Sequence, residues 1–248
     1  MTEEQQPHVS AKKPFNPRHY DLMMAGMVTV LLCANLIGPA KVAELDLPLI
    51  GLVAFGAGNL FFPISYIFAD CLTEVYGYSR ARRAIWAGFI ALIFATAMGQ
   101  LIVHMPPSPD EPFNAVLQPA LETVFGGTWR IVLASIIAYW VGDFANAYVM
   151  AKMKIWTQGK HLWTRTIGST LVGQGLDSMI FYPIAFAGIW TSETLLMVII
   201  ANFSLKVGVE VFFTPVTYFV VNRLKRAEGR DVYDEDTDFT PFVIKGES

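Results

Sequence analysis

The sequence predicts an all-α integral membrane protein with six transmembrane helices and both termini in the cytoplasm. Of its 248 residues, 54% are hydrophobic and 16% are charged, whereas soluble domains carry about 25% charged residues. No charged residue lies from Leu47 to Ala69 or from Ala84 to Val103. Each run is long enough to cross roughly 30 Å of bilayer hydrocarbon as a helix. These observations favour one membrane domain over one or two soluble domains.

Six apolar runs are interpreted as spans, because a helix pairs its own peptide groups where no water can reach them. The first run, "LMMAGMVTVLLCANLIGPA", shows no small-residue cleavage site, so we expect a retained span and not a signal peptide. The last run is long enough to tilt or to extend beyond the bilayer. The expected spans are 20–39, 49–70, 84–104, 129–152, 167–190 and 194–222.

Lysine and arginine gather in the four segments that six spans would place on one side of the membrane. The loop "MPPSPDEPFNAVLQPALETVFGG", on the other side, is acidic and should contain a short surface helix around "AVLQPALETVF". Positively charged loops stay in the cytoplasm. We therefore expect a flexible cytoplasmic arm at 1–19, a six-helix membrane domain at 20–226 and a solvated acidic cytoplasmic tail at 227–248.

Ionisable side chains inside spans are costly, so each is a functional hypothesis. In the span 129–152, Asp143 shares a face with Tyr139 and Asn146. A polar seam between packed helices would explain this pattern equally well.

The span 167–190 carries a polar stripe. Gln174, Asp177, Ser178 and Phe181 are spaced by three and four residues, and Asp177 lies about ten residues into the span. At 1.5 Å per residue that is roughly 15 Å, near the membrane midplane. A carboxylate, an amide, a hydroxyl and an aromatic ring on one stripe suit a flat polar solute.

The last span places Lys206 and Glu210 four residues apart at depth. Either they neutralise each other and lower the cost of insertion, or they form with Asp177 a charge network that changes partners on ligand binding. Pro215 should kink this helix.

The stretch "PISYIFADCLTEVYGY" places Asp70 and Glu74 on one face at the cytoplasmic end of the second span. Arg80, Arg82 and Arg83 follow. The carboxylates form either an interfacial salt-bridge cluster or an inner gate beside a polar cavity, to which Asn59 would also belong. The chain has no phosphate loop, no metal-spaced His or Cys cluster and no dinucleotide fingerprint, so no enzyme, cofactor or metal is expected.

Three motifs resemble the bacterial queuosine precursor transporter family, also called the vitamin-uptake-like family. They are "FPISYIFADCLTEVYGYSRARRAIW", "GSTLVGQGLDSMIFYPIAF" and "LKVGVEVFFTPVTYFVVNRLK", within a resemblance that covers 20–226. It implies a multi-pass inner-membrane importer of 7-deazaguanine bases, such as 7-cyano-7-deazaguanine, which are salvaged for tRNA modification. The expected partners are this small molecule and the lipid bilayer, with no nucleic acid, and a homo-oligomer is left open.

A guanine-like edge presents two donors side by side, which one carboxylate can accept. Asp177 or Glu210 would suit that role, with Gln174 and Asn146 reading the carbonyl edge. Phe181, Trp140 or Phe61 would stack on the ring face. Such stacking contributes about 1–3 kcal/mol per base in nucleic-acid sites. The complete set of candidate binding residues is Gln174, Asp177, Ser178, Phe181, Lys206, Glu210, Asp143, Asn146, Trp140 and Phe61, with Asp70, Glu74 and Asn59 as gate or coupling residues.

Transport by alternating access has two alternatives. The chain could be a binding subunit that needs a separate energy-coupling ATPase. It could also be an intramembrane aspartyl protease with Asp143 and Asp177 as its dyad. Against the protease, Trp140 replaces the first glycine of the usual Gly-x-Gly-Asp pattern, and Lys206 would disturb a shared proton.

Overall fold

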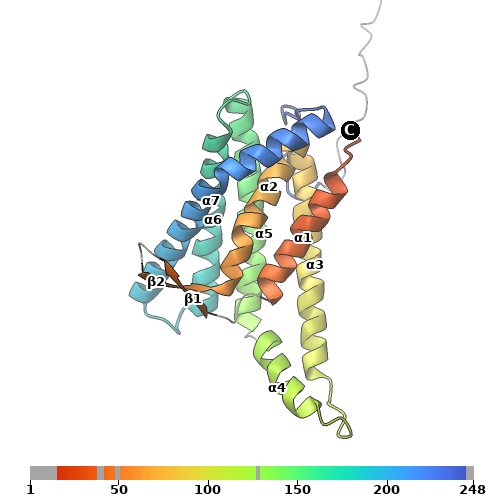
Figure 1. The fold of residues 1–248 in the computed structure, drawn as a ribbon, viewed down its shortest axis with the longest axis vertical. Helices are drawn as coiled ribbons and strands as arrows, with labels where there is room; N and C mark the ends of the chain where they lie inside the picture. The colour runs from red at the N-terminus through yellow and green to blue at the C-terminus, as the bar shows by residue number, and fades with distance from the viewer. Residues whose placement is uncertain (1–15, 38–41, 48–50, 127–128, 244–248) are drawn as a thin grey trace, which may run out of the picture.

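The computed structural model describes residues 16–37, 42–47, 51–126 and 129–243, which form a helical bundle with one short hairpin (Figure 1). Seven α-helices occur in these residues. They are α1 (Tyr20–Leu36), α2 (Phe62–Tyr76), α3 (Tyr78–His104), α4 (Asn114–Phe125), α5 (Trp129–Trp156), α6 (Leu162–Phe186) and α7 (Ser192–Glu228). The helix α4 confirms the short helix expected in the acidic loop, and it lies away from the bundle against the far end of α3.

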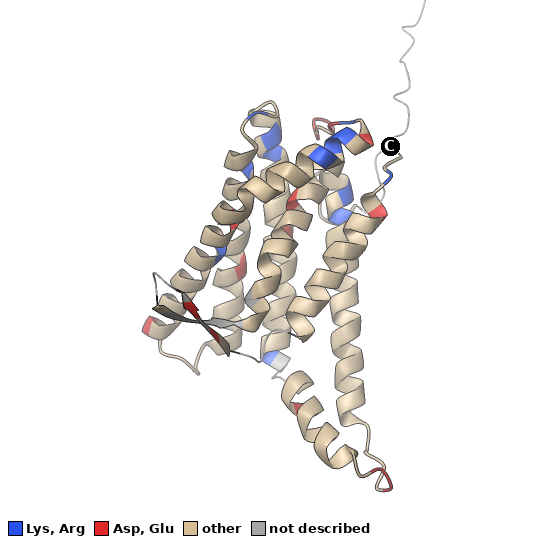
Figure 2. Ribbon diagram, viewed as in Figure 1, with Lys and Arg blue, Asp and Glu red and all other residues tan. Residues whose placement is uncertain are grey.

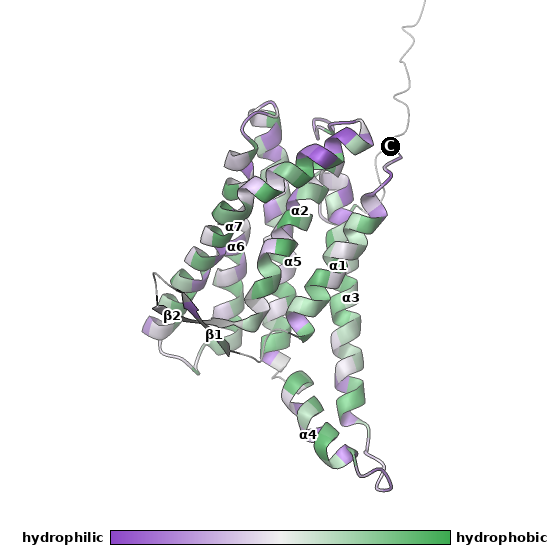
Figure 3. Ribbon diagram, in the orientation of Figure 1, coloured by the Kyte–Doolittle hydropathy of each residue, from purple (hydrophilic) through white to green (hydrophobic). Residues whose placement is uncertain are grey.

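Three of these helices, α3, α5 and α7, are long and apolar enough to cross a membrane, and α1 is a shorter apolar helix. Large apolar side chains on their outer surfaces are exposed, including Phe94 at 66%, Phe212 at 76% and Phe219 at 68%. Figure 3 shows this apolar character along the outside of the bundle. An extensive exposed apolar surface marks contact with lipid or another partner, so the described fold is that of a helical membrane protein.

The expected helix over 49–70 is wrong in its first half. Strands β1 (Val42–Leu47) and β2 (Gly51–Gly56) pair antiparallel, with Val42 opposite Gly56, and a 3₁₀ helix (Ala57–Phe61) leads into α2. Short apolar runs are ambiguous between strand and helix. Here the glycines of "GLVAFGAG" disfavour a continuous helix.

The boundary between α2 and α3 depends on Gly77. Pro63 stands in the first turn of α2, where its missing N–H costs nothing. The helix ends at Gly77, whose φ of 84° is accessible to glycine and strained for other residues. A Cβ there would also meet Val232 Cγ1 at 2.9 Å. This sharp corner sets α2 and α3 side by side.

The helices α5 and α6 approach each other at two glycines. A Cβ built on Gly173 would lie 2.9 Å from the carbonyl oxygen of Gly142, and one on Gly142 would lie 3.1 Å from that of Gly173. Small residues permit such close backbone contact between membrane helices. The polar stripes of α5 and α6 are therefore held beside each other.

The tail after α7 packs on the bundle, so the expectation of a solvated tail is wrong for this segment. Asp234 is 3% exposed, and both of its carboxylate oxygens accept the N–H of Tyr78 at 3.1 Å. Arg82 donates to the carbonyl oxygens of Asp238 and Thr240 at 2.7 Å. A carboxylate at a helix N-terminus satisfies an unpaired donor and complements the helix dipole. The tail thereby caps α3.

Candidate functional site

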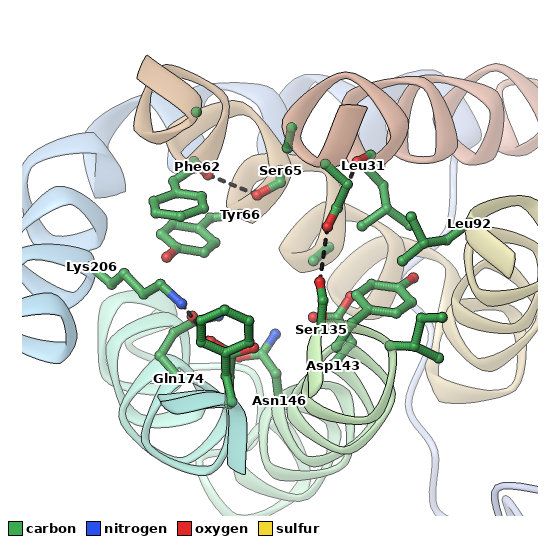
Figure 4. A pocket seen from close by; sticks show the side chains of 18 of the residues that line it. Leu31, Phe62, Ser65, Tyr66, Leu92, Ser135, Asp143, Asn146, Gln174 and Lys206 are labelled. Atoms are coloured by element: carbon green, nitrogen blue, oxygen red, sulfur yellow. Dashed lines mark hydrogen bonds and ion pairs between the residues drawn. The ribbon is translucent and has the colours of Figure 1, made fainter. Parts of the chain in front are cut away.

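A cavity of about 470 Å³ lies among the helices (Figure 4), within the size range of small-molecule sites. It extends from Leu36 and Ile131, near the ends of α1 and α5 that lie far from the tail, down to Asp70 and Asn146. Its polar lining residues are Asn35, Ser65, Tyr66, Asp70, Thr96, Ser135, Tyr139, Asp143, Asn146, Thr170, Gln174, Asp177, Tyr182, Asn202 and Lys206.

An ion pair between α6 and α7 forms one wall of this cavity. Lys206 Nζ lies 2.5 Å from Asp177 Oδ2, with the two side chains 12% and 23% exposed. The same Nζ lies 5.1 Å from the ring centroid of Phe62, at the start of α2. The predicted alternative in which Lys206 neutralises Glu210 is wrong for this structure, because Lys206 bonds across helices instead.

Glu210 contacts α2. Its carboxyl group lies within hydrogen-bonding reach of that of Asp70, and the Asn146 amide also lies close to Asp70. Asp70 and Glu210 are each 1% exposed, and Asn146 is 8% exposed. This polar cluster lies at the inner end of the cavity, where Asp70 and Asn146 belong to the lining.

One turn beyond Asp70, the cavity is sealed by a second cluster. Glu74, with a fully buried side chain, accepts two hydrogen bonds from Arg165, at 2.7 and 2.8 Å, and one from Lys225 at 2.6 Å. Lys154 Nζ lies 3.4 Å from Glu74 and 2.5 Å from Asp231 of the tail. The cluster joins α2, α5, α6, α7 and the tail. Residues 71–76 of α2 are each at most 2% exposed, so this end is closed.

The pKa of Asp231 reflects the positive charge of this closed end. Burial raises the pKa of its carboxyl group, but hydrogen bonds from Lys154 and Lys225 outweigh burial and lower that pKa below its ordinary value. Most lysines and arginines of the described chain gather at the same end of the bundle (Figure 2). We call it the basic end.

The structure brings seven of the predicted site residues to the cavity, namely Asp70, Asp143, Asn146, Gln174, Asp177, Phe181 and Lys206. The lining does not include the other predicted site residues whose side chains are described, namely Ser178, Glu210, Trp140, Phe61 and Glu74. Trp140 belongs to an aromatic cluster, 5.1 Å from Phe144 and 5.9 Å from Phe242. The side chain of Asn59 lies outside the part of the chain that the structure describes.

Sequence reasoning missed several lining residues and the cations that bind Glu74. Tyr66 precedes Asp70 by one turn on the same face, so the helical period alone could have identified it. Phe62 stacks on Tyr66, with ring centroids 6.1 Å apart at 18°. Arg165, Lys154 and Lys225 are far from Glu74 in sequence, and no local spacing predicts their contact.

A helical membrane bundle with a polar cavity closed at one end defines the class of membrane proteins that bind or move small molecules. The family model described as "Putative vitamin uptake transporter" matches residues 56–220, and the chain belongs to this family of transporters. The resemblance identified from the sequence motifs is thereby confirmed.

Two curated relatives are similar to the chain. One is the "Probable queuosine precursor transporter" of Bacillus subtilis (strain 168), 34% identical over 78% of this chain and 80% of the relative. The other is the "Queuosine precursor transporter" of Escherichia coli (strain K12), 26% identical over 67% of this chain and 73% of the relative. No solved structure matches the chain.

Proposed function

We propose that this protein imports queuosine precursors, 7-deazaguanine bases such as 7-cyano-7-deazaguanine, across the bacterial inner membrane. The main support for the proposal is the polar cavity. Its lining includes the carboxylate of Asp177, the amides of Gln174 and Asn146 and the aromatic ring of Phe181. The names of the two relatives support the substrate class. The imported base would enter the salvage route for tRNA modification.

Six spans would be α1, α2 with its 3₁₀ helix, α3, α5, α6 and α7. The 15 residues of α2, at 1.5 Å each, and the five of the 3₁₀ helix, at 2.0 Å each, reach roughly 30 Å, the thickness of the hydrocarbon. By the positive-inside rule the basic end faces the cytoplasm, with both termini. The domain limits 1–19, 20–226 and 227–248 remain part of this proposal, with α7 continuing two residues into the last.

Recognition of the base is assigned to the cavity. Asp177 accepts the paired donors of the guanine-like edge, while Lys206 holds its carboxylate in place. Gln174 and Asn146, both in the lining, read the carbonyl edge. Phe181 stacks on the ring face. Asp143, one turn from Tyr139 on α5, lines the same cavity.

The asymmetry of the two ends supports transport by alternating access. The cavity is bounded near the far end by Leu36 and Ile131, whereas Glu74 and its cations close the basic end. With the basic end in the cytoplasm, closure at that end would make this an outward-facing state. Glu74 is the inner gate, and base entry to the cytoplasm requires its ion pairs to separate.

The binding-subunit alternative differs in one observable, since it requires an ATPase partner. Reconstitution of the purified chain alone separates the two, because only a self-sufficient transporter moves base without ATP. The protease alternative has no support in the structure, because Asp177 is paired with Lys206.

Ligand-induced thermal stabilisation tests the substrate class. The purified protein, Asp177→Asn and the matched control Asp110→Asn, at an exposed loop position, are melted with a panel of purines and 7-deazapurines. A ligand at 100 times its Kd stabilises by about 2.7 kcal/mol. We expect selective stabilisation by 7-cyano-7-deazaguanine in the wild type and Asp110→Asn, and its loss in Asp177→Asn. A folded protein that responds to no base would overturn the proposal.

A further inference from the structure

Two buried carboxyl groups from different helices, that of Asp70 on α2 and that of Glu210 on α7, lie within hydrogen-bonding reach of each other. An ionised carboxylate only accepts hydrogen bonds, so a bond between two carboxyl groups requires a proton on one of them. Each residue is 1% exposed, which leaves no room for a hydration shell. One proton placed between the two carboxyl groups would let them bond and would remove their mutual repulsion.

The charged groups around the pair do not neutralise it. Glu74 and Tyr66 flank Asp70 on α2, Asp143 lies on α5 and Asp177 on α6, and all of these are acids. Lys206, one turn from Glu210, pairs with Asp177, while Lys154, Arg165 and Lys225 bind Glu74. Asp21 of α1 is exposed, and Arg82 of α3 binds the tail. Within the described residues no ion pair neutralises Asp70 or Glu210, so a bound proton would take the place of a cation.

The pair is placed between the cavity and the gate. Asp70 and its neighbour Asn146 line the cavity, and Glu74 follows Asp70 by one turn toward the basic end. Asp70 Oδ2 and Glu210 Oε1 are buried and receive a hydrogen from no donor group among the described residues. A proton that arrives through the cavity can therefore bind at Asp70, which lines it, and rearrangement of the neighbouring gate would expose the same site to the other side.

We propose that Asp70 and Glu210 form a proton-binding site that couples entry of one proton to entry of each base. This inference rests on the proposed function. A proton from the outer solution binds the carboxylate when the cavity faces outward, and it leaves as a proton to the cytoplasm when the basic end opens. No other bond forms or breaks.

Infrared spectroscopy of the purified protein tests the proton site without any substrate. The wild type should show a protonated-carboxyl C=O band at neutral pH that disappears in Glu210→Gln, where the Gln amide donates to an ionised Asp70, and in Asp70→Asn. Glu193→Gln, an exposed position on the same helix α7, should leave the band unchanged. The same band in all four proteins would overturn the site.

Proteoliposomes test the coupling. With the membrane potential clamped at zero and the outside one pH unit more acidic, one proton per base supports about tenfold accumulation of 7-cyano-7-deazaguanine, because each 1.4 kcal/mol is a factor of ten. We expect this ratio in the wild type and in Glu193→Gln. Glu210→Gln should still exchange labelled base in counterflow. It should not accumulate the base, so that the inside and outside concentrations stay about equal, because the pair formed by Asp70 and the substituted amide no longer binds and releases a proton.

The outcomes separate the two proposals. Intact counterflow without gradient-driven accumulation in the wild type would overturn the coupling and leave import standing. Accumulation by Glu210→Gln equal to that of the wild type would also overturn it. Absence of both counterflow and binding for every 7-deazapurine would overturn the proposed function and the coupling with it, while the infrared band would still decide whether the pair holds a proton.

Discussion

Single side chains in this protein are most informative where charge is buried. Glu74 has a fully buried side chain, yet it bonds to Arg165 and Lys225 with three hydrogen bonds of 2.6 to 2.8 Å. Buried charges are stable only when paired, and removing one partner leaves the others without compensation. The same reasoning explains why Lys206 lies against Asp177.

Glu74→Gln should therefore destabilise the protein. The amide keeps the shape of the side chain but removes its charge from three nearby cations, and breaking such a buried pair costs about 3–5 kcal/mol. Denaturation in detergent measures the free energy of unfolding. Glu235→Gln, at an exposed position in the tail, is the control. Equal stability of the two variants would contradict the role of Glu74 in closing the basic end.

The ion pairs of Asp231 predict a pH dependence. Its folded pKa is lower than its ordinary value of 3.8, so the folded protein binds that proton more weakly than the unfolded chain does. The stabilisation is fully present above about pH 4 and is lost as the pH falls through the folded pKa. Asp231→Asn should melt earlier than the wild type at pH 7, and the difference should shrink at pH 3. A difference that is unchanged at pH 3, or one shared by Asp236→Asn, would contradict this.

At the scale of elements, the glycines of the α5–α6 pair decide how closely two helices approach. A Cβ on Gly173 would meet Asn146 Cβ at 2.8 Å, whereas a Cβ on Gly208 of α7 would meet nothing within 4 Å. The same substitution should therefore have opposite effects at the two positions.

Gly173→Ala should lower stability by about 1–3 kcal/mol, the usual cost of overpacking. Gly208→Ala should leave stability unchanged or raise it by about 0.5–1 kcal/mol, because alanine restricts the unfolded chain and favours a helix. Melting temperatures of both variants provide the measurement. A loss at Gly208 as large as that at Gly173 would show that helix contact is not the cause.

Helices were predictable from this sequence, and the contacts between them were not. Apolar runs longer than 20 residues indicate spans whatever their neighbours, which is why α3 and α5 fall near their expected limits. The strand pair Val42–Leu47 and Gly51–Gly56 was missed because short apolar runs are ambiguous between strand and helix. Local spacing left open whether Lys206 neutralises Glu210 alone or joins a charge network with Asp177, and the fold pairs Lys206 with Asp177 from α6. The tail was read as solvated because its composition is acidic, and only tertiary structure reveals Arg82 beside it.

At the scale of the whole molecule, the described residues form a closed end and a polar cavity, and this asymmetry can be tested from outside. Ser135 lines the cavity and hydrogen-bonds to Asn35 at 3.0 Å, whereas Met150, further along α5, is fully buried near the basic end. If the basic end is cytoplasmic, a reagent outside the cell should reach the first position and not the second.

Ser135→Cys, in a chain without Cys33 and Cys71, should react with a membrane-impermeant maleimide added to intact cells. Met150→Cys should not react. Bound 7-cyano-7-deazaguanine should slow labelling of Ser135→Cys by occupying the cavity. Labelling that requires access from the cytoplasm would reverse the proposed orientation.

The length of α7 has a mechanical consequence. Its 37 residues, about 55 Å of continuous helix, carry Lys206 at the cavity, Glu210 at the acid pair and Lys225 at the gate. Pro215 lies between the last two and leaves the carbonyl group of Val211 without its helical donor. The missing bond makes Pro215 a point at which the helix can bend. Under the proposed function, bending there as the cavity is loaded would move the segment that carries Lys225 and so link occupation of the cavity to separation of the gate.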